Sequence, residues 1–245
     1  MAAFRFISHG LTHIGLVRQR NEDAFLDRPD LGPGIGVWAV ADGMGGHEAG
    51  DFASASIVTA LGAIEPPNDL DSFAEAAAAE LDAVDHALRL RAAKLGPYAV
   101  IASTVVVLLA KEDEVAGLWA GDSRLYHWRS AGLRQLTRDH SKVQEMVDAG
   151  LLRPEQAHHH PHSNIVTRSV GGGVFELGRL RHRAEAGDRF LLCSDGLTNL
   201  VADAEIAVEL AAPPRVAALR LRDHVLARGA PDNVTIVIVE AKPAA

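Results

Sequence analysis

The feature of this sequence that most constrains its fold is a set of isolated aspartates beside apolar, strand-like runs and glycines. The clearest run spans 36–41, and Asp42 and Gly43 follow it directly. Similar runs precede Asp195 and follow Asp232. A carboxylate at the end of a buried strand is held by a rigid element and faces a loop region that ligands can reach. Several carboxylates gathered there would repel one another unless a cation, most simply a divalent metal ion, lay between them.

Plain turns are the alternative interpretation, because Asp-Gly is also the commonest hairpin turn signal. Neither Asp42-Gly43 nor Asp195-Gly196 joins two alternating strands, however, because each leads into a stretch with a helical pattern. Oxygen ligands select hard ions, so the pattern predicts Mg²⁺ or Mn²⁺ rather than zinc or copper. Two such ions about 4 Å apart can lower the pKa of a bridging water and hold the oxygens of an in-line displacement.

The composition indicates one soluble domain, 1–245. Its residues are 48% hydrophobic, which is enough for a sizeable core. The net charge of -8 argues against a general binder of nucleic acid or anionic membranes. The single cysteine, Cys193, lies in an apolar run and is interpreted as a buried hydrophobe. The start of the chain lacks the pattern of an export signal, and the uncharged run 98–110 is shorter than the roughly 20 residues of a membrane helix. We therefore expect a cytoplasmic protein, and a monomer.

The order of the expected elements is strands, then helices, then strands again, which predicts an α+β fold. Apolar spacing predicts one helix over 49–64, and a capping box at Ser72 and Glu75 predicts the start of a second, which stops near 95–97. Two hairpins are expected after these helices, 103–110 with 115–120 and 125–128 with 133–136. The chain is then expected to close with a strand at 190–194, a helix at 215–228 and a strand at 234–240.

A polar, irregular segment spans 151–173, after a short helix that Ser141 is expected to cap. A long irregular segment inside a compact domain is usually a functional or a mobile loop. Its histidines at 158–160 and 162 suggest adventitious zinc binding, but a solvated loop is the favoured interpretation.

Five segments carry a family resemblance when they are taken together and in order, namely 15–23, 41–47, 121–124, 193–198 and 232–235. They resemble the metal-dependent Ser/Thr protein phosphatases of the type 2C class, and most closely its compact bacterial branch. The resemblance covers the chain from about residue 11 to residue 239. It implies a four-layer sandwich, in which helices flank two antiparallel sheets, and a flap subdomain around 141–173 beside the active site.

The resemblance also implies a site for two Mn²⁺ or Mg²⁺ ions, with a weak third. By position, Asp42 resembles the carboxylate that bridges two ions. Asp195 and Asp232 resemble the remaining ligands of the first ion, and Gly43 would offer its carbonyl oxygen to the second. Asp122 matches a ligand of the third ion.

The remaining matched positions lie near the start of the chain. Glu22 and Asp23 match an acidic pair that acts mostly through metal-bound waters. Arg18 matches the arginine that binds phosphate, and its planar fork suits phosphate in a way that a lysine does not.

The sequence departs from the family pattern at two positions. Met44 stands where animal-type members carry a histidine that is a candidate general acid. His47 lies close by and is the candidate proton donor here, with a metal-bound water or a solvated helix-start histidine as the alternatives. Asn199 stands where many relatives carry an aspartate beside the third ion, so weaker binding of that ion is expected.

The function implied is hydrolysis of phosphoserine and phosphothreonine in proteins by direct attack of a hydroxide that bridges the two ions. The expected partners are phosphorylated proteins, including a cognate Ser/Thr kinase, and neither nucleic acid nor a membrane. One alternative is a catalytically weak phosphoprotein-binding regulatory module of the same fold, which the presence of Asp42, Asp195 and Asp232 disfavours. The other alternative is a metal-dependent phosphodiesterase, which the acidic charge balance disfavours.

Overall fold

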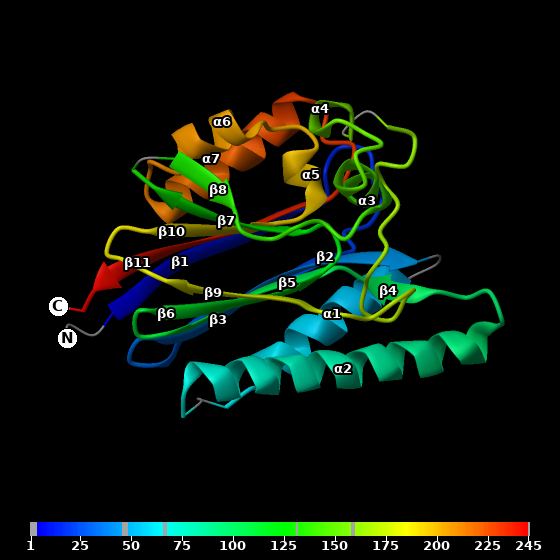
Figure 1. Cartoon of the computed structure of the whole chain (residues 1–245), viewed down its shortest axis with the longest axis horizontal. Coiled ribbons are helices and arrows are strands. Elements are labelled where there is room, and N and C mark those ends of the chain that lie inside the picture. Colours follow the sequence, from blue (N-terminus) through cyan, green and yellow to red (C-terminus); the bar gives the residue numbers. More distant parts are fainter. Residues whose placement is uncertain (1–3, 46–48, 66–67, 131, 158–159, 245) are drawn as a thin grey trace.

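Two antiparallel sheets pack face to face in the structure, a computed structural model that describes residues 4–45, 49–65, 68–130, 132–157 and 160–244 (Figure 1). The β1 sheet contains, in spatial order, β1 (Phe4–His13), β11 (Val234–Pro243), β10 (Arg189–Cys193), β7 (Arg124–Arg129) and β8 (Gly132–Gln135). The β2 sheet contains β2 (Asp23–Gly32), β3 (Ile35–Gly45), β5 (Val105–Lys111), β6 (Glu114–Ala120) and β9 (Gly178–Arg183), with β4 (Ile101–Ser103) paired to β3.

Helices form the two outer layers (Figure 1). The β2 sheet is covered by α1 (Ala49–Gly62) and α2 (Leu70–Leu95), and the β1 sheet by α5 (Asp195–Thr198), α6 (Asp203–Glu209) and α7 (Pro214–Ala227). Two short helices, α3 (Lys142–Asp148) and α4 (Pro154–Ala157), lie in the segment between β8 and β9. The expected α+β class and four-layer sandwich are therefore confirmed. None of the described helices has the length and apolarity that crossing a bilayer requires.

The apolar runs of the central strands are explained by burial on both faces. In β3, Val37 and Ala39 face the helices of the outer layer, whereas Trp38 and Val40 face the space between the two sheets. Side chains alternate between the faces of a strand, so a strand buried on both sides must be apolar at almost every position. β11 follows the same rule, with alternate residues in the core between the sheets and in the core beneath α5, α6 and α7.

The expected hairpins β5–β6 and β7–β8 are present, but the expected start of the second long helix was wrong. Asp69, not Ser72, is the N-cap residue of α2. The Asp69 carboxylate accepts a hydrogen bond from the Ser72 amide at 2.7 Å, and the Ser72 hydroxyl accepts one from the Asp69 amide at 3.3 Å. The N-cap residue is therefore Asp69, three residues before the one that the Ser72–Glu75 pattern had predicted.

Asp42 does not end its strand, which corrects the expectation from the sequence. β3 continues to Gly45 but changes partner at this point, from β5 up to Val40 to β4 from Gly43 onward. Thr104 lies between β4 and β5 and makes two hydrogen bonds to the backbone of Asp42. Its amide donates to the Asp42 carbonyl oxygen at 2.9 Å, and its hydroxyl accepts from the Asp42 amide at 3.2 Å. This change of partner opens the sheet where the Asp42 side chain projects.

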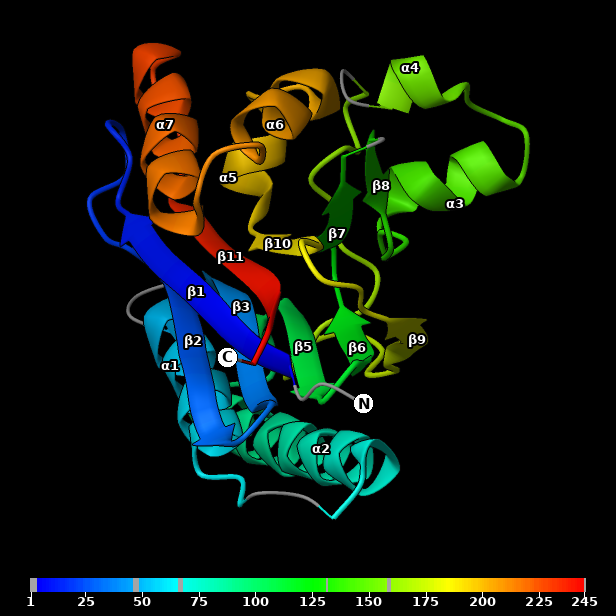
Figure 2. The ribbon, with the colours of Figure 1, turned by 90° about the vertical axis from the view of Figure 1, so that its left-hand side faces the viewer.

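Pairing of the first and last strands fixes where the chain ends and the Arg18 loop lie in the sandwich. β1 pairs with β11 from Phe4 opposite Pro243 to His13 opposite Val234. The two chain ends described therefore lie close together at one end (Figures 1 and 2). The loop that carries Arg18 and the residues just before β11 lie together at the other end.

Candidate functional site

A cavity of about 770 Å³ opens at the end of the sandwich where β10 ends and β11 begins. Its walls come from loops and element ends of both sheets. The predicted site residues that line it are Arg18, Glu22, Asp42, Gly43, Asp122, Asp195 and Asp232. Segments far apart in the sequence thus deliver carboxylates to one place, as the pattern of isolated aspartates had suggested.

Asp23 is the member of the predicted set that lies beneath the cavity rather than in its wall. It stands opposite Asp42 in the β2–β3 ladder and is 8% exposed. Its Oδ2 accepts hydrogen bonds from the hydroxyls of Ser194 at 2.8 Å and Thr235 at 2.7 Å, whereas its Oδ1 is buried without a hydrogen-bond partner. Burial raises the pKa of Asp23 to about 7, against the hydrogen bonds that favour the charged form.

The carboxylates in the wall share the same electrostatic problem. Burial, followed by the charges of Asp23 and Asp195, raises the pKa of Asp42 well above its usual value. Burial and the charge of Asp195 raise the pKa of Asp122 to about 8, and burial and the charge of Asp232 raise that of Asp195. Without a cation, burial and mutual repulsion therefore favour the protonated forms of these carboxyls. A cluster of this kind is a natural site for divalent cations.

Two glycines allow the backbone segments around the carboxylates to approach closely. A Cβ added to Gly43 would lie 2.0 Å from the Gly50 carbonyl oxygen, and one added to Gly196 would lie 1.9 Å from the Asn233 carbonyl oxygen. No side chain fits at such distances. Gly43 therefore brings β3 against the start of α1, and Gly196 brings α5 against the start of β11.

Arg18 lies at the edge of the cavity with half of its side chain exposed. Its Nη2 donates a hydrogen bond to Oδ2 of Asp232 at 2.8 Å. The other oxygen of Asp232 accepts from the backbone amide of Asn233, also at 2.8 Å. The guanidinium therefore lies beside the carboxylates at the edge of the cavity.

Asn233 organises the Arg18 loop, a role that sequence reasoning missed. Its Oδ1 accepts from the Glu22 amide at 2.9 Å, and its Nδ2 donates to the carbonyl oxygens of Ile14 at 2.8 Å and Arg20 at 2.9 Å. Ser194 and Thr235, which bond Asp23, were likewise missed as partners. Both residues lie inside segments that carry the family resemblance, 193–198 and 232–235, and this was the sequence signal that could have pointed to them. Their contacts can be seen only in the fold.

Asn199 contacts the site directly. Its Nδ2 donates to Oδ2 of Asp195 at 3.0 Å and so uses one of the positions at which that oxygen could bind a cation. A second cavity of about 590 Å³ lies next to the first and shares Asp122, Asn164, Asp195 and Asn199 with it.

The remaining expectations concern the segment around the cavity mouth. Ile165 and Val166 line the cavity, and Val166 forms an isolated bridge with Ser141, the N-cap residue of α3 as expected. His47 falls outside the described residues, as do the histidines at 158 and 159. His160 and His162 are described, with ring centroids 5.1 Å apart, away from the predicted ligands of the cavity.

Comparison with known proteins agrees with this geometry. The sequence profile described as "Protein phosphatase 2C" matches residues 10–223. The chain is 37% identical over 231 residues to the serine/threonine protein phosphatase PstP of Mycobacterium tuberculosis (strain CDC 1551 / Oshkosh). That match covers 92% of this chain but 43% of PstP, so the chain spans less than half the length of this curated relative.

Two solved structures extend the comparison to the fold. PppA, titled a key regulatory component of T6SS in Pseudomonas aeruginosa, is 40% identical with a TM-score of 0.89, over 98% of this chain and 100% of that one. The catalytic domain of PstP in complex with 2 manganese ions is 34% identical with a TM-score of 0.82, over 98% and 99%. On these matches, the chain belongs to the protein phosphatase 2C family of metal-dependent Ser/Thr phosphatases.

Proposed function

We propose that this chain is a protein phosphatase that hydrolyses phosphoserine and phosphothreonine with the help of two divalent ions, Mn²⁺ or Mg²⁺. The observation that carries the proposal is the convergence of partly buried carboxylates on one cavity with a half-exposed arginine at its edge. Membership of the family and the two manganese ions in the PstP catalytic domain support it.

The side chains around the cavity fit such ions. The donors are oxygens, which hard divalent ions prefer. Burial and mutual repulsion raise the pKa of Asp42 and Asp195, a penalty that cations would remove. We propose that Asp42, Asp195 and Asp232 would hold the ions, with Asp42 shared between the two and Asp195 and Asp232 serving the first, and that the carbonyl oxygen of Gly43 would serve the second.

Glu22 and Asp23 are proposed to act on the ions through water. The Glu22 amide is fixed by Asn233, and its carbonyl oxygen accepts from the Gly43 amide at 3.1 Å, so this residue is tied to β3. Asp23 retains one buried oxygen with no hydrogen-bond partner, which suits a water held beneath the cavity.

Divalent ions held here would lower the pKa of water and neutralise charge on phosphoryl oxygens. Arg18 has donors left over after its bond to Asp232, and these are proposed to orient the phosphate. Cys193 is fully buried and burial raises its pKa to about 12, so it is no nucleophile. This supports direct attack by water without a phosphoenzyme. His47 is the proposed proton donor to the leaving oxygen.

A third ion is proposed to bind weakly, with Asp122 as one of the residues that would hold it. Asp122 lines both cavities and its carboxyl is held protonated up to about pH 8 by burial and the charge of Asp195. Asn199, however, already donates to Asp195, and it brings no charge of its own. Both effects lower the affinity for a third cation.

The proposed substrates are phosphorylated proteins, with a cognate Ser/Thr kinase among them. We propose that 1–245 form one catalytic domain, in which 141–173 act as a flap that guides the substrate. Ile165 and Val166, which line the mouth of the cavity, support this role. The similarity to PppA makes phosphoproteins linked to secretion one group of substrates to test first.

The test is Mn²⁺-dependent release of phosphate from a phosphothreonine peptide. Asp42→Asn and Asp195→Asn should each lower kcat/KM by about 100-fold or more, because each removes charge from the ion site. Asp30→Asn, on the exposed end of β2, is the matched control and should retain activity.

Wild-type activity in Asp42→Asn and Asp195→Asn would overturn the assigned roles. If the wild-type protein binds the phosphopeptide without turnover, it is instead a regulatory phosphoprotein-binding module. Robust nuclease activity without peptide turnover would identify a phosphodiesterase.

A further inference from the structure

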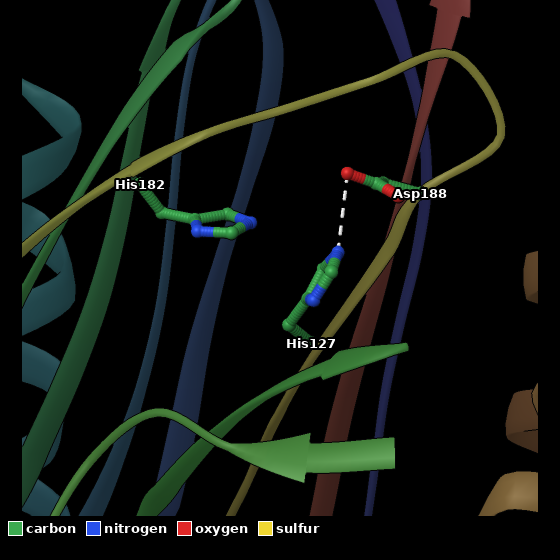
Figure 3. A group of neighbouring side chains, drawn as sticks. All are labelled: His127, His182 and Asp188. Atoms are coloured by element: carbon green, nitrogen blue, oxygen red, sulfur yellow. Dashed lines mark ion pairs between the residues drawn. The ribbon is translucent and has the colours of Figure 1, made fainter. Parts of the chain in front are cut away.

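A second group of metal-ligating side chains lies between the two sheets, at the end away from the cavity. It consists of His127 on β7, His182 on β9 and Asp188 just before β10 (Figure 3). His127 pairs with Phe190, whereas Arg124 on the same strand pairs with Cys193, next to the Asp195 turn. Three residues of β-strand span ~10 Å. The group therefore lies clear of the carboxylate cavity.

Strand alternation explains why these side chains meet. Leu125 on β7 faces the space between the sheets, and His127, two residues on, faces the same way. Leu180 on β9 packs against the same core, and His182 is two residues beyond it. The two imidazoles thus approach from opposite sheets, with ring centroids 4.6 Å apart.

The ligand atoms converge on one point. One ligand atom from each residue lies within 4.8 Å of the other two, and Figure 3 shows the three side chains directed toward one another. Nε2 of His127 is 3.1 Å from Oδ2 of Asp188, but without the geometry of a hydrogen bond. Nε2 of both His127 and His182 is buried and has no hydrogen-bond partner in the described structure. Buried polar atoms without partners are rare and call for a ligand or an ion.

We propose that His127, His182 and Asp188 bind one divalent transition-metal ion, Zn²⁺ in preference to Mg²⁺ or Mn²⁺, that links the two sheets. Two imidazoles and one carboxylate form a common ligand set for zinc, with a fourth position for water. Imidazole suits zinc, whereas carboxylates and water suit magnesium and manganese. This site is thus chemically distinct from the oxygen-only cavity.

The surroundings of the three residues are compatible with a cation. The charged neighbours of the group are of both signs: Arg129 pairs with Asp188 and Glu185, and Arg134 lies near His182.

The carboxylate of Asp188 is held in place by its other contacts. Oδ1 accepts from Nε of Arg129 at 2.6 Å, and Oδ2 accepts from Nη2 of Arg129 at 2.8 Å and the Glu185 amide at 2.9 Å. Such contacts orient metal ligands. An ion on Oδ2 would replace Nη2, and the Arg129 side chain is 38% exposed, so it has room to turn outward.

The experiment compares zinc binding in wild-type protein, His127→Asn and His182→Asn. Each is dialysed against Zn²⁺ in excess Mg²⁺, and bound zinc is counted by elemental analysis. The wild-type protein should hold one more equivalent of zinc than either variant. Zinc should also raise the Tm of the wild-type protein more than that of either variant. Co²⁺ should give a tetrahedral absorption band only in the wild type.

The control variant is His86→Asn, which removes an exposed histidine on α2 and should bind zinc like the wild type. Retained phosphatase activity in Mg²⁺ would show that His182→Asn is folded. Equal zinc content in the wild type and both site variants would overturn the proposal, whatever the activity of the carboxylate site. It is therefore independent of the proposed phosphatase function.

Discussion

Asp232 is held from two sides by its nearest neighbours in the fold. One oxygen accepts from Arg18 and the other from the backbone amide of Asn233. Arg18 is thus restrained by a carboxylate but remains half exposed, and it lines the cavity. A positioned guanidinium binds phosphate in a bidentate manner that lysine cannot reproduce. The strength of phosphate binding should therefore depend on this one side chain.

Replacing Arg18 with Ala should lower kcat/KM for a phosphothreonine peptide about 10- to 100-fold, mainly through a higher KM. A hydrogen bond to a charged group contributes about 1.5–3 kcal/mol, which corresponds to this range. Arg18→Lys should recover only part of the loss. Steady-state kinetics in saturating Mn²⁺ measure the effect, and Arg5→Ala on β1 is the control. An unchanged KM would show that Arg18 does not hold phosphate.

Among the elements, α2 does more than cover the β2 sheet. Asp85 on this helix accepts a hydrogen bond from the Gly171 amide at 2.7 Å through Oδ1, and one from Nε of Arg89 at 2.7 Å through Oδ2. Nη2 of Arg89 in turn donates to the carbonyl oxygens of Gly172 and Gly173. α2 thereby holds residues 171–173 in place. Ile165 and Val166, earlier in the same segment, line the cavity.

Replacing Asp85 with Ala should therefore loosen the segment 164–174 and lower stability by about 1–3 kcal/mol, since the buried Gly171 amide loses its partner. Hydrogen exchange should become faster in this segment but not in the β1 sheet. Asp82→Ala, one turn earlier on the exposed side of α2, should change neither. Equal exchange rates in Asp85→Ala and wild type would contradict the proposed attachment.

At the scale of the whole molecule, the carboxylate site opposes folding when no metal is present. Burial raises the pKa of Asp23 to about 7 and that of Asp122 to about 8, whereas in the unfolded chain aspartate titrates near 3.9. The folded state therefore binds more protons than the unfolded state between these values, and its stability falls as pH rises. His140 acts in the opposite sense below about pH 6.5, because burial lowers its pKa to about 4.

The Tm of the protein in EDTA should therefore fall as pH rises from 6.5 to 8, the window in which His140 no longer titrates. The stabilisation by Mn²⁺ should grow over the same window, because the ions offset the repulsion. Differential scanning fluorimetry at fixed ionic strength measures both trends. Asp122→Asn should flatten the slope in EDTA. A Tm that rises with pH in EDTA would be incompatible with protonated site carboxyls.

Much of this arrangement could be predicted from local patterns. The apolar runs predicted β3, β10 and β11, because strands buried on both faces must be apolar throughout. The hairpin signals predicted β5–β6 and β7–β8, and Ser141 predicted the start of α3. Strands β2 and β9 were not predicted. β2 mixes charged and apolar residues without a clear alternation, whereas β9 does alternate, but its half-buried positions are Gly178, Leu180 and His182 between exposed arginines, which is a weak apolar signal.

The sequence alone determined which kinds of residue could form a site: isolated aspartates, the glycines that follow some of them, and one arginine, in an order typical of the 2C phosphatases. Tertiary structure decided their depth and partners. Asp23 lies opposite Asp42 on the neighbouring strand, Asn233 fixes the Arg18 loop, and His127 meets His182 across the sheets. These contacts join segments far apart in the chain, and their geometry depends on strand register and sheet packing, which local sequence spacing does not encode.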